Sequence, residues 1–184
     1  MLLETWRGAK EGLSLGMTAE EGRRALRPVA FWLHSKDKRT QAPGTEIEPV
    51  LEEALRSLRW KGGSARDFLE RVRDESGLLT GWSDQRYGFM HLGFQEYLAA
   101  LDIRGRHLEG EDSLAELASH HGESWWQEVA LLLVALDEPS LFEPYLSEVV
   151  ELDSFAEHPE ALDLLLEDTY EVSERPFLQV LETC

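Results

Sequence analysis

Apolar residues recur every three or four positions along most of the chain, which is the spacing of a helix that buries one face. The first such pattern, in residues 1–15, predicts a short amphipathic helix. The second begins after Thr18, which has Glu21 three residues later, the pairing known as a capping box. We expect this second helix to run to about His34.

Two more helices are predicted before residue 77. The polar stretch from Ser35 to Thr45 is interpreted as a loop, and the apolar residues of the next helix fall between Pro49 and Leu58. The following helix starts after Ser64, whose side chain can cap the first turn. It stops at Gly77, where glycine permits a left-handed backbone.

The spacing then changes to that of extended chain. Leu78 to Thr80 and Arg86 to Met90 are short runs rich in apolar and aromatic residues, and turn-forming residues lie between them. These runs predict the two strands of a β-hairpin. Three helices followed by a β-hairpin form a winged helix.

A fourth helix is predicted from near His91, and everything after it has a helical pattern. Helical segments of about 10–15 residues with short connectors indicate stacked antiparallel helix pairs, a solenoid-like arm. We therefore expect a mainly α protein in three parts. These are an N-terminal helical segment (1–17), a helical segment with the winged-helix domain (18–104) and an acidic helical arm (105–184).

Charge divides the chain close to the start of this arm. The formal net charge is −18, yet seventeen of the eighteen basic residues precede His107, and residues 107–184 carry twenty acids against Arg175 alone. Such an acidic half repels phosphate backbones, so nucleic-acid binding is not expected of it. A basic protein partner would account for the charge, and so would a solvated surface that serves solubility alone.

Several classes of protein are disfavoured by what the sequence lacks. No apolar run approaches the ~20 residues that span a bilayer, and residues 1–10 lack a signal-peptide pattern, so we expect a cytoplasmic protein without membrane association. The single cysteine, Cys184, leaves no internal disulfide and no cysteine-based zinc site. His34, His120 and His121 lack further ligands at metal spacing, so no metal site is expected.

The most specific feature lies where the predicted hairpin meets the fourth helix. Residues 77–79 read Gly-Leu-Leu, and residues 89–100 read Phe-Met-His-Leu-Gly-Phe-Gln-Glu-Tyr-Leu-Ala-Ala. This pattern resembles the winged-helix signature of the NACHT-type (STAND, NLR-like) signal-transduction ATPases. In that family the signature reads Gly-Leu-Leu, a variable turn, then Phe-x-His-x-x-Phe-Gln-Glu-Tyr-Leu-Ala-Ala. The resemblance covers residues 18–104.

The resemblance implies that the chain is the regulatory part of a larger ATPase. In the family, the histidine that corresponds to His91 reaches the β-phosphate of bound ADP and holds the closed resting state. This chain has no Gly-x-x-x-x-Gly-Lys-Ser/Thr phosphate loop. We therefore expect no catalysis and no cofactor in the chain itself, with ADP or ATP bound by a nucleotide-binding domain upstream in the same polypeptide. By spacing alone, His91 could also be a histidine of the core.

The other signature residues are interpreted as structural. Phe89, Phe94 and Tyr97 are expected to pack in the domain, since each is an aromatic residue at a core-facing position. Gln95 and Glu96 open the fourth helix and are expected to cap it.

Two other functions stay open. A free-standing winged helix could bind DNA through Arg66, Arg71 and Arg73, with Arg86 on the wing, although neighbouring acids weaken the positive field there. Alternatively, the acidic helices could form a protein-interaction scaffold that makes no nucleotide contact.

Overall fold

The computed structural model describes residues 16–81, 85–136, 139–152 and 158–167. The chain forms two compact units that divide between Ala99 and Ala100, inside one long helix. The helix predicted in residues 1–15 lies outside the described residues. The predicted boundaries after residues 17 and 104 stay predictions.

Unit 1 begins with three helices, α2 (Ala19–Ser35), α3 (Gly44–Ser57) and α4 (Ala65–Ser76). Both predicted helix starts are confirmed. The amide of Glu21 donates to Thr18 Oγ1 at 3.2 Å, and the amide of Asp67 donates to Ser64 Oγ at 3.1 Å. In each case the acidic side chain accepts a hydrogen bond from the amide of the capping residue, which completes a capping box. Gly77 ends α4 with a left-handed φ of 64°.

A three-stranded antiparallel sheet completes unit 1, with strands β1 (Gln41–Pro43), β2 (Leu79–Gly81) and β3 (Arg86–Phe89) in the order β1-β3-β2. The prediction of a loop through Thr45 was wrong, because residues 41–43 form β1 and α3 begins at Gly44. A segment of three residues that ends in a proline is too short to show the alternation of apolar and polar residues that marks a strand. Residues 41–43 form a strand because they pair with β3, where Gln41 lies opposite Gly88.

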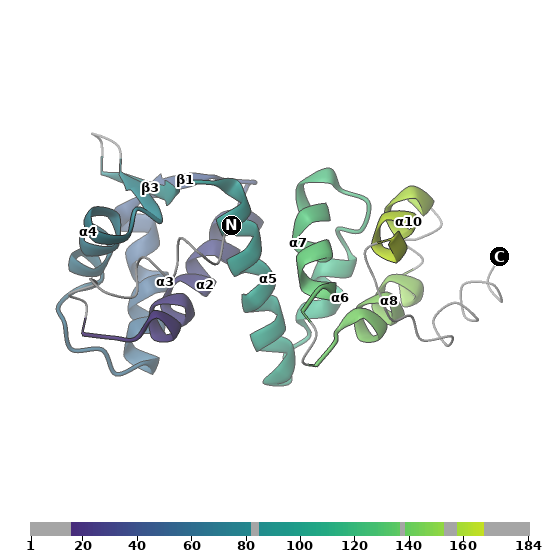
Figure 1. Cartoon of the computed structure of the whole chain (residues 1–184), viewed down its shortest axis with the longest axis horizontal. Coiled ribbons are helices and arrows are strands. Elements are labelled where there is room, and N and C mark those ends of the chain that lie inside the picture. Colours follow the sequence, from purple (N-terminus) through teal and green to yellow (C-terminus); the bar gives the residue numbers. More distant parts are fainter. Residues whose placement is uncertain (1–15, 82–84, 137–138, 153–157, 168–184) are drawn as a thin grey trace. The chain divides into compact units, whose positions relative to one another are not determined.

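The core of unit 1 lies between these helices and the sheet. The helix α3 packs against α2 and α4, and the sheet packs against α3 and α4 (Figure 1). Trp60 meets Phe68 edge to face, with ring centroids 5.4 Å apart. The fully buried side chains of this core include Leu26, Leu33, Ile47, Leu51, Phe68 and Leu69. The mainly helical fold with a small β-wing is thereby confirmed.

The helix α5 (Leu92–Leu108) passes from unit 1 into unit 2, which also contains α6 (Ser113–Ala118), α7 (Ser124–Val134), α8 (Phe142–Glu151) and α10 (Pro159–Glu167). α6 packs on α8, and α7 packs on α8 and α10. The helical character of the arm is confirmed. The described helices of the arm range from six to eleven residues, so no repeat of fixed length is evident in the part that the structure describes, and a solenoid stays a prediction. None of the described helices is long and apolar enough to cross a membrane.

Candidate functional site

His91 lies at the junction between the wing and α5, and it is exposed. Its carbonyl oxygen accepts a hydrogen bond from the amide of Phe94 at 3.1 Å, so the backbone of His91 opens the first turn of α5. The imidazole lies beside the ring of Phe94, with centroids 5.7 Å apart and planes inclined by 38°. This position does not fit a histidine of the core, and it leaves the imidazole accessible to a ligand or a partner.

The two neighbours of His91 are exposed apolar residues. Met90 is 48% exposed and Leu92 is 38% exposed, and we call residues 90–92 the His91 surface. The backbone amide of Met90 donates to the carbonyl oxygen of Leu78 at 2.9 Å, so the segment is anchored to the strand side of the wing.

The first turn of α5 contains no acidic residue. The carboxylate of Glu96 lies beside this turn, with Oε2 4.0 Å from the position of a Cβ on Gly93, and it offsets part of the positive end of the helix dipole. The exposed imidazole of His91 stands immediately before this turn. A helix start of this kind, with a hydrogen-bond donor beside it, suits a negatively charged group.

The structure places the other signature residues as follows. Phe89 and Phe94 are buried, as predicted for packing residues, whereas Tyr97 is half-buried. Gln95 is 1% exposed, and its amide nitrogen Nε2 donates to the carbonyl oxygen of Arg39 at 2.9 Å. The prediction that Gln95 caps α5 was therefore wrong, because its side chain reaches the loop after α2. Glu96 is half-buried.

Three of the four arginines that would contact DNA are engaged by neighbouring side chains, namely Arg66, Arg73 and Arg86. Arg66 forms an ion pair with Glu48 at 3.1 Å, and Arg73 forms one with Asp74 at 2.6 Å. The hydrogen bond from Arg73 holds the pKa of the Asp74 carboxyl below its usual range. On the wing, Nε of Arg86 donates to Gln41 Oε1 at 3.2 Å. These contacts disfavour the DNA-binding hypothesis, because phosphate contacts would have to displace them.

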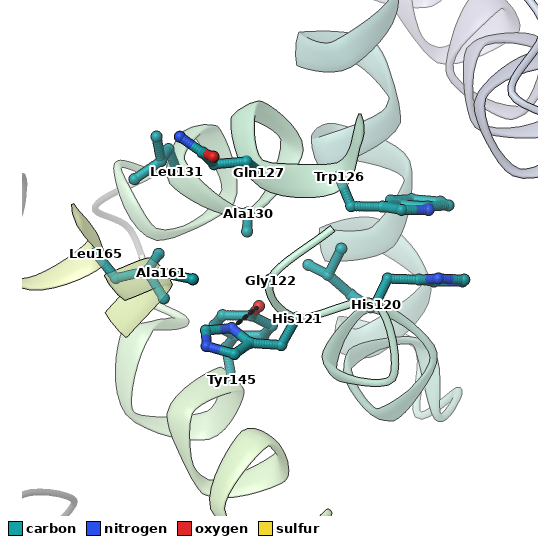
Figure 2. Close-up of a pocket in the computed structure, with 11 residues that line it drawn as sticks. His120, His121, Gly122, Trp126, Gln127, Ala130, Leu131, Tyr145, Ala161 and Leu165 are labelled. Carbon is teal, nitrogen blue, oxygen red and sulfur yellow. Dashed lines mark hydrogen bonds between the residues drawn. The ribbon is translucent and has the colours of Figure 1, made fainter. Parts of the chain in front are cut away.

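A second polar cluster lies in unit 2 and was missed by sequence reasoning. His121 is 7% exposed, and its Nδ1 lies 3.3 Å from the hydroxyl oxygen of Tyr145. Figure 2 shows both side chains at a small cavity between α7, α8 and α10, which encloses about 20 Å³ and so has room for about one water molecule. Burial is the main cause that lowers the pKa of His121, and the nearby His158 adds to it.

The neighbouring His120 points to a different surface. Its ring stacks on Trp126 with centroids 4.7 Å apart, and its Nδ1 lies 2.8 Å from Oε1 of Glu123 (Figure 2). Among the residues that the structure describes, no group of three or more His, Cys, Asp and Glu side chains is arranged to hold a metal ion. The two adjacent histidines thus take part in packing on two sides of the α6–α7 connection.

The three helices and the small sheet of unit 1 define a winged-helix domain. A family model described as a winged helix-turn-helix domain C-terminal to NACHT matches residues 1–103, more than half of the chain. The chain belongs to this family, so its association with a NACHT domain is implied. No curated protein and no solved structure gave a match. Within this family the winged helix is a non-catalytic domain.

Proposed function

We propose that this chain is the regulatory arm of a NACHT ATPase, and that His91 contacts the β-phosphate of ADP bound in the NACHT domain. The observation that carries the proposal is the exposed position of His91 before a helix whose first turn contains no acidic residue. An imidazole nitrogen can donate a hydrogen bond to a phosphate oxygen, and this bond is charge-assisted. The contact would hold the winged helix against the ADP-bound domain and stabilise the resting state.

The apolar residues that flank His91 would supply the protein contact. Burying the exposed parts of Met90 and Leu92 against the NACHT domain removes apolar area from water, which favours association at about 25 cal/mol for each Å². The contact is lost when ADP leaves, and the γ-phosphate of an incoming ATP would occupy space beside the β-phosphate, so nucleotide exchange would weaken the interface. Release of the winged helix then relays the signal through the arm.

The release rate of a fluorescent ADP analogue tests this proposal. The wild-type chain, supplied with the NACHT domain of the same polypeptide, should slow release. A His91→Ala variant should release the analogue about ten- to a hundredfold faster, since a charge-assisted hydrogen bond contributes about 1.5–3 kcal/mol. His107→Ala is the matched control, because His107 lies in the last turn of the same helix. Equal release rates for wild type and His91→Ala would contradict the proposal.

The acidic arm supports a second function, the capture of a basic protein partner. Burial raises the pKa of Glu148, and Glu151 and Asp112 raise it further, which shows that like charges gather around this carboxylate. A basic partner would relieve the repulsion. Binding of such a partner should weaken steeply between about 50 and 300 mM salt, because the Debye length shortens over this range. Binding that is independent of salt would contradict an electrostatic interface.

A further inference from the structure

The side chain of Gln95 joins three elements of unit 1 at a buried point. Gln95 belongs to the first two turns of α5, His34 to the last turn of α2, and Arg39 to the loop between α2 and β1. Nε2 of Gln95 lies 2.9 Å from the carbonyl oxygen of Arg39 and 3.4 Å from Nδ1 of His34. Both Gln95 and His34 are almost completely buried.

The chemistry of the acceptors fixes the orientation of the Gln95 amide. A carbonyl oxygen can only accept, so the nitrogen and not the oxygen of the amide must face Arg39. The second amide hydrogen then points toward His34, which must present an unprotonated Nδ1. One side chain thus links a helix end and a loop to the start of α5.

The loop that supplies the carbonyl oxygen is itself held in a defined shape. Asp37 and Lys38 have left-handed φ angles of 58° and 53°, a conformation that costs energy for residues other than glycine. The amide of Arg39 donates to the carbonyl oxygen of Leu33 at 3.0 Å, and its guanidinium pairs with Glu46 at 2.5 Å. The acceptor of Gln95 is therefore anchored to α2 and to α3.

His91 lies between two fixed points. On one side, the amide of Met90 donates a hydrogen bond to the carbonyl oxygen of Leu78. On the other side, the first turn of α5 is held by the buried side-chain amide of Gln95. A leucine would fill a similar space but would remove the donor that Gln95 offers to the carbonyl oxygen of Arg39 and to Nδ1 of His34. We infer that Gln95 is a positioning residue that holds the first turn of α5, and with it His91, in the geometry for its phosphate contact. This inference rests on the proposed function of His91.

Gln95→Leu tests the inference, because it removes both hydrogen bonds and keeps the volume close to that of glutamine. The first readout is amide hydrogen exchange of Phe94 in the chain alone, since this amide bonds to the carbonyl oxygen of His91. Exchange should be about tenfold faster in Gln95→Leu. The control is Ile47→Val, a conservative deletion in the buried core of α3. Exchange at Phe94 that matches wild type, or that rises no more than in Ile47→Val, would overturn the inference.

The second readout is release of the fluorescent ADP analogue from the NACHT domain, as for His91→Ala. Gln95→Leu should accelerate release and Ile47→Val should not, although both weaken the fold. If His91→Ala accelerates release and Gln95→Leu does not, the positioning role is refuted while the proposed function stands. If His91→Ala has no effect, the proposed function fails, and the exchange of the Phe94 amide still decides whether Gln95 holds the turn.

Discussion

Three histidines of this chain differ in role because they differ in surroundings. His91 is exposed beside the start of α5, His34 is buried against Gln95, and His121 is buried against Tyr145. Of these three, His91 is the exposed one, so a ligand from outside the domain can reach it without a rearrangement. The sequence motif singled out His91, whereas the partners of His34 and His121 lie 61 and 24 residues away along the chain. No local pattern indicates pairings at such separations.

The buried position of His121 makes the stability of unit 2 depend on pH. Burial lowers its pKa in the folded state below the ordinary value of about 6.5. Below that pH the unfolded chain takes up a proton that the folded chain does not, so the free energy of unfolding decreases as the pH falls through 6.5 and levels off at the folded pKa. We expect urea to unfold α7 and α8 at lower concentration at pH 5.5 than at pH 7.5, as followed by the NMR signals of Val129 and Val149.

A His121→Gln variant tests whether the titration of His121 causes this pH dependence of the stability of unit 2. Glutamine does not titrate, so the decrease between pH 7.5 and 5.5 should largely disappear, whereas His107→Gln should retain it. The raised pKa of Glu148 has the opposite effect on the free energy of unfolding. The folded state binds this proton more readily than the unfolded state, so Glu148 favours the folded state as the pH falls. The effect of Glu148 on stability appears at lower pH than that of His121, because the ordinary pKa of a glutamate is about 4.3. An unchanged pH dependence in His121→Gln would contradict the assignment.

At the scale of elements, β1 depends on a close approach to Gly88. A Cβ at Gly88 would lie 2.2 Å from the carbonyl oxygen of Thr40, which is backbone and cannot move aside cheaply. We expect Gly88→Ala to destabilise unit 1 by about 1–3 kcal/mol, the cost typical of an overpacked site. Chemical unfolding monitored by circular dichroism measures this change.

Gly105 provides the matched control, since a Cβ there would meet nothing within 4 Å and the residue lies within α5. Gly105→Ala should be neutral or stabilise the protein by about 0.5 kcal/mol, because alanine is the better helix former. If both variants had the same effect, the pairing of β1 with β3 would not be a significant part of the fold.

The elements also show which parts of the fold can be predicted from sequence. The caps at Thr18 and Ser64 and the stop at Gly77 were predicted because their signals lie within three residues of the helix end. The strand at residues 41–43 was not, because it exists through pairing with a segment some 45 residues later. The same reason applies to Gln95. Its position near a helix start indicated a cap, while its actual acceptor, the carbonyl oxygen of Arg39, is set by tertiary structure.

At the scale of the molecule, the chain combines a near-neutral winged helix with a strongly acidic helical arm. The family match covers residues 1–103, and the arm extends beyond the matched region. Under the proposed function the two parts would have separate partners, and only the acidic arm has a charge that favours a basic protein.

The most direct test of the central claim is an experimental structure of the ADP-bound polypeptide that contains both the NACHT domain and this chain. We expect an imidazole nitrogen of His91 to lie about 2.7–3.2 Å from an oxygen of the β-phosphate. We also expect Met90 and Leu92 to be buried against the NACHT domain. A structure in which His91 faces solvent, and only residues of the NACHT domain touch the phosphates, would contradict the proposed role of His91.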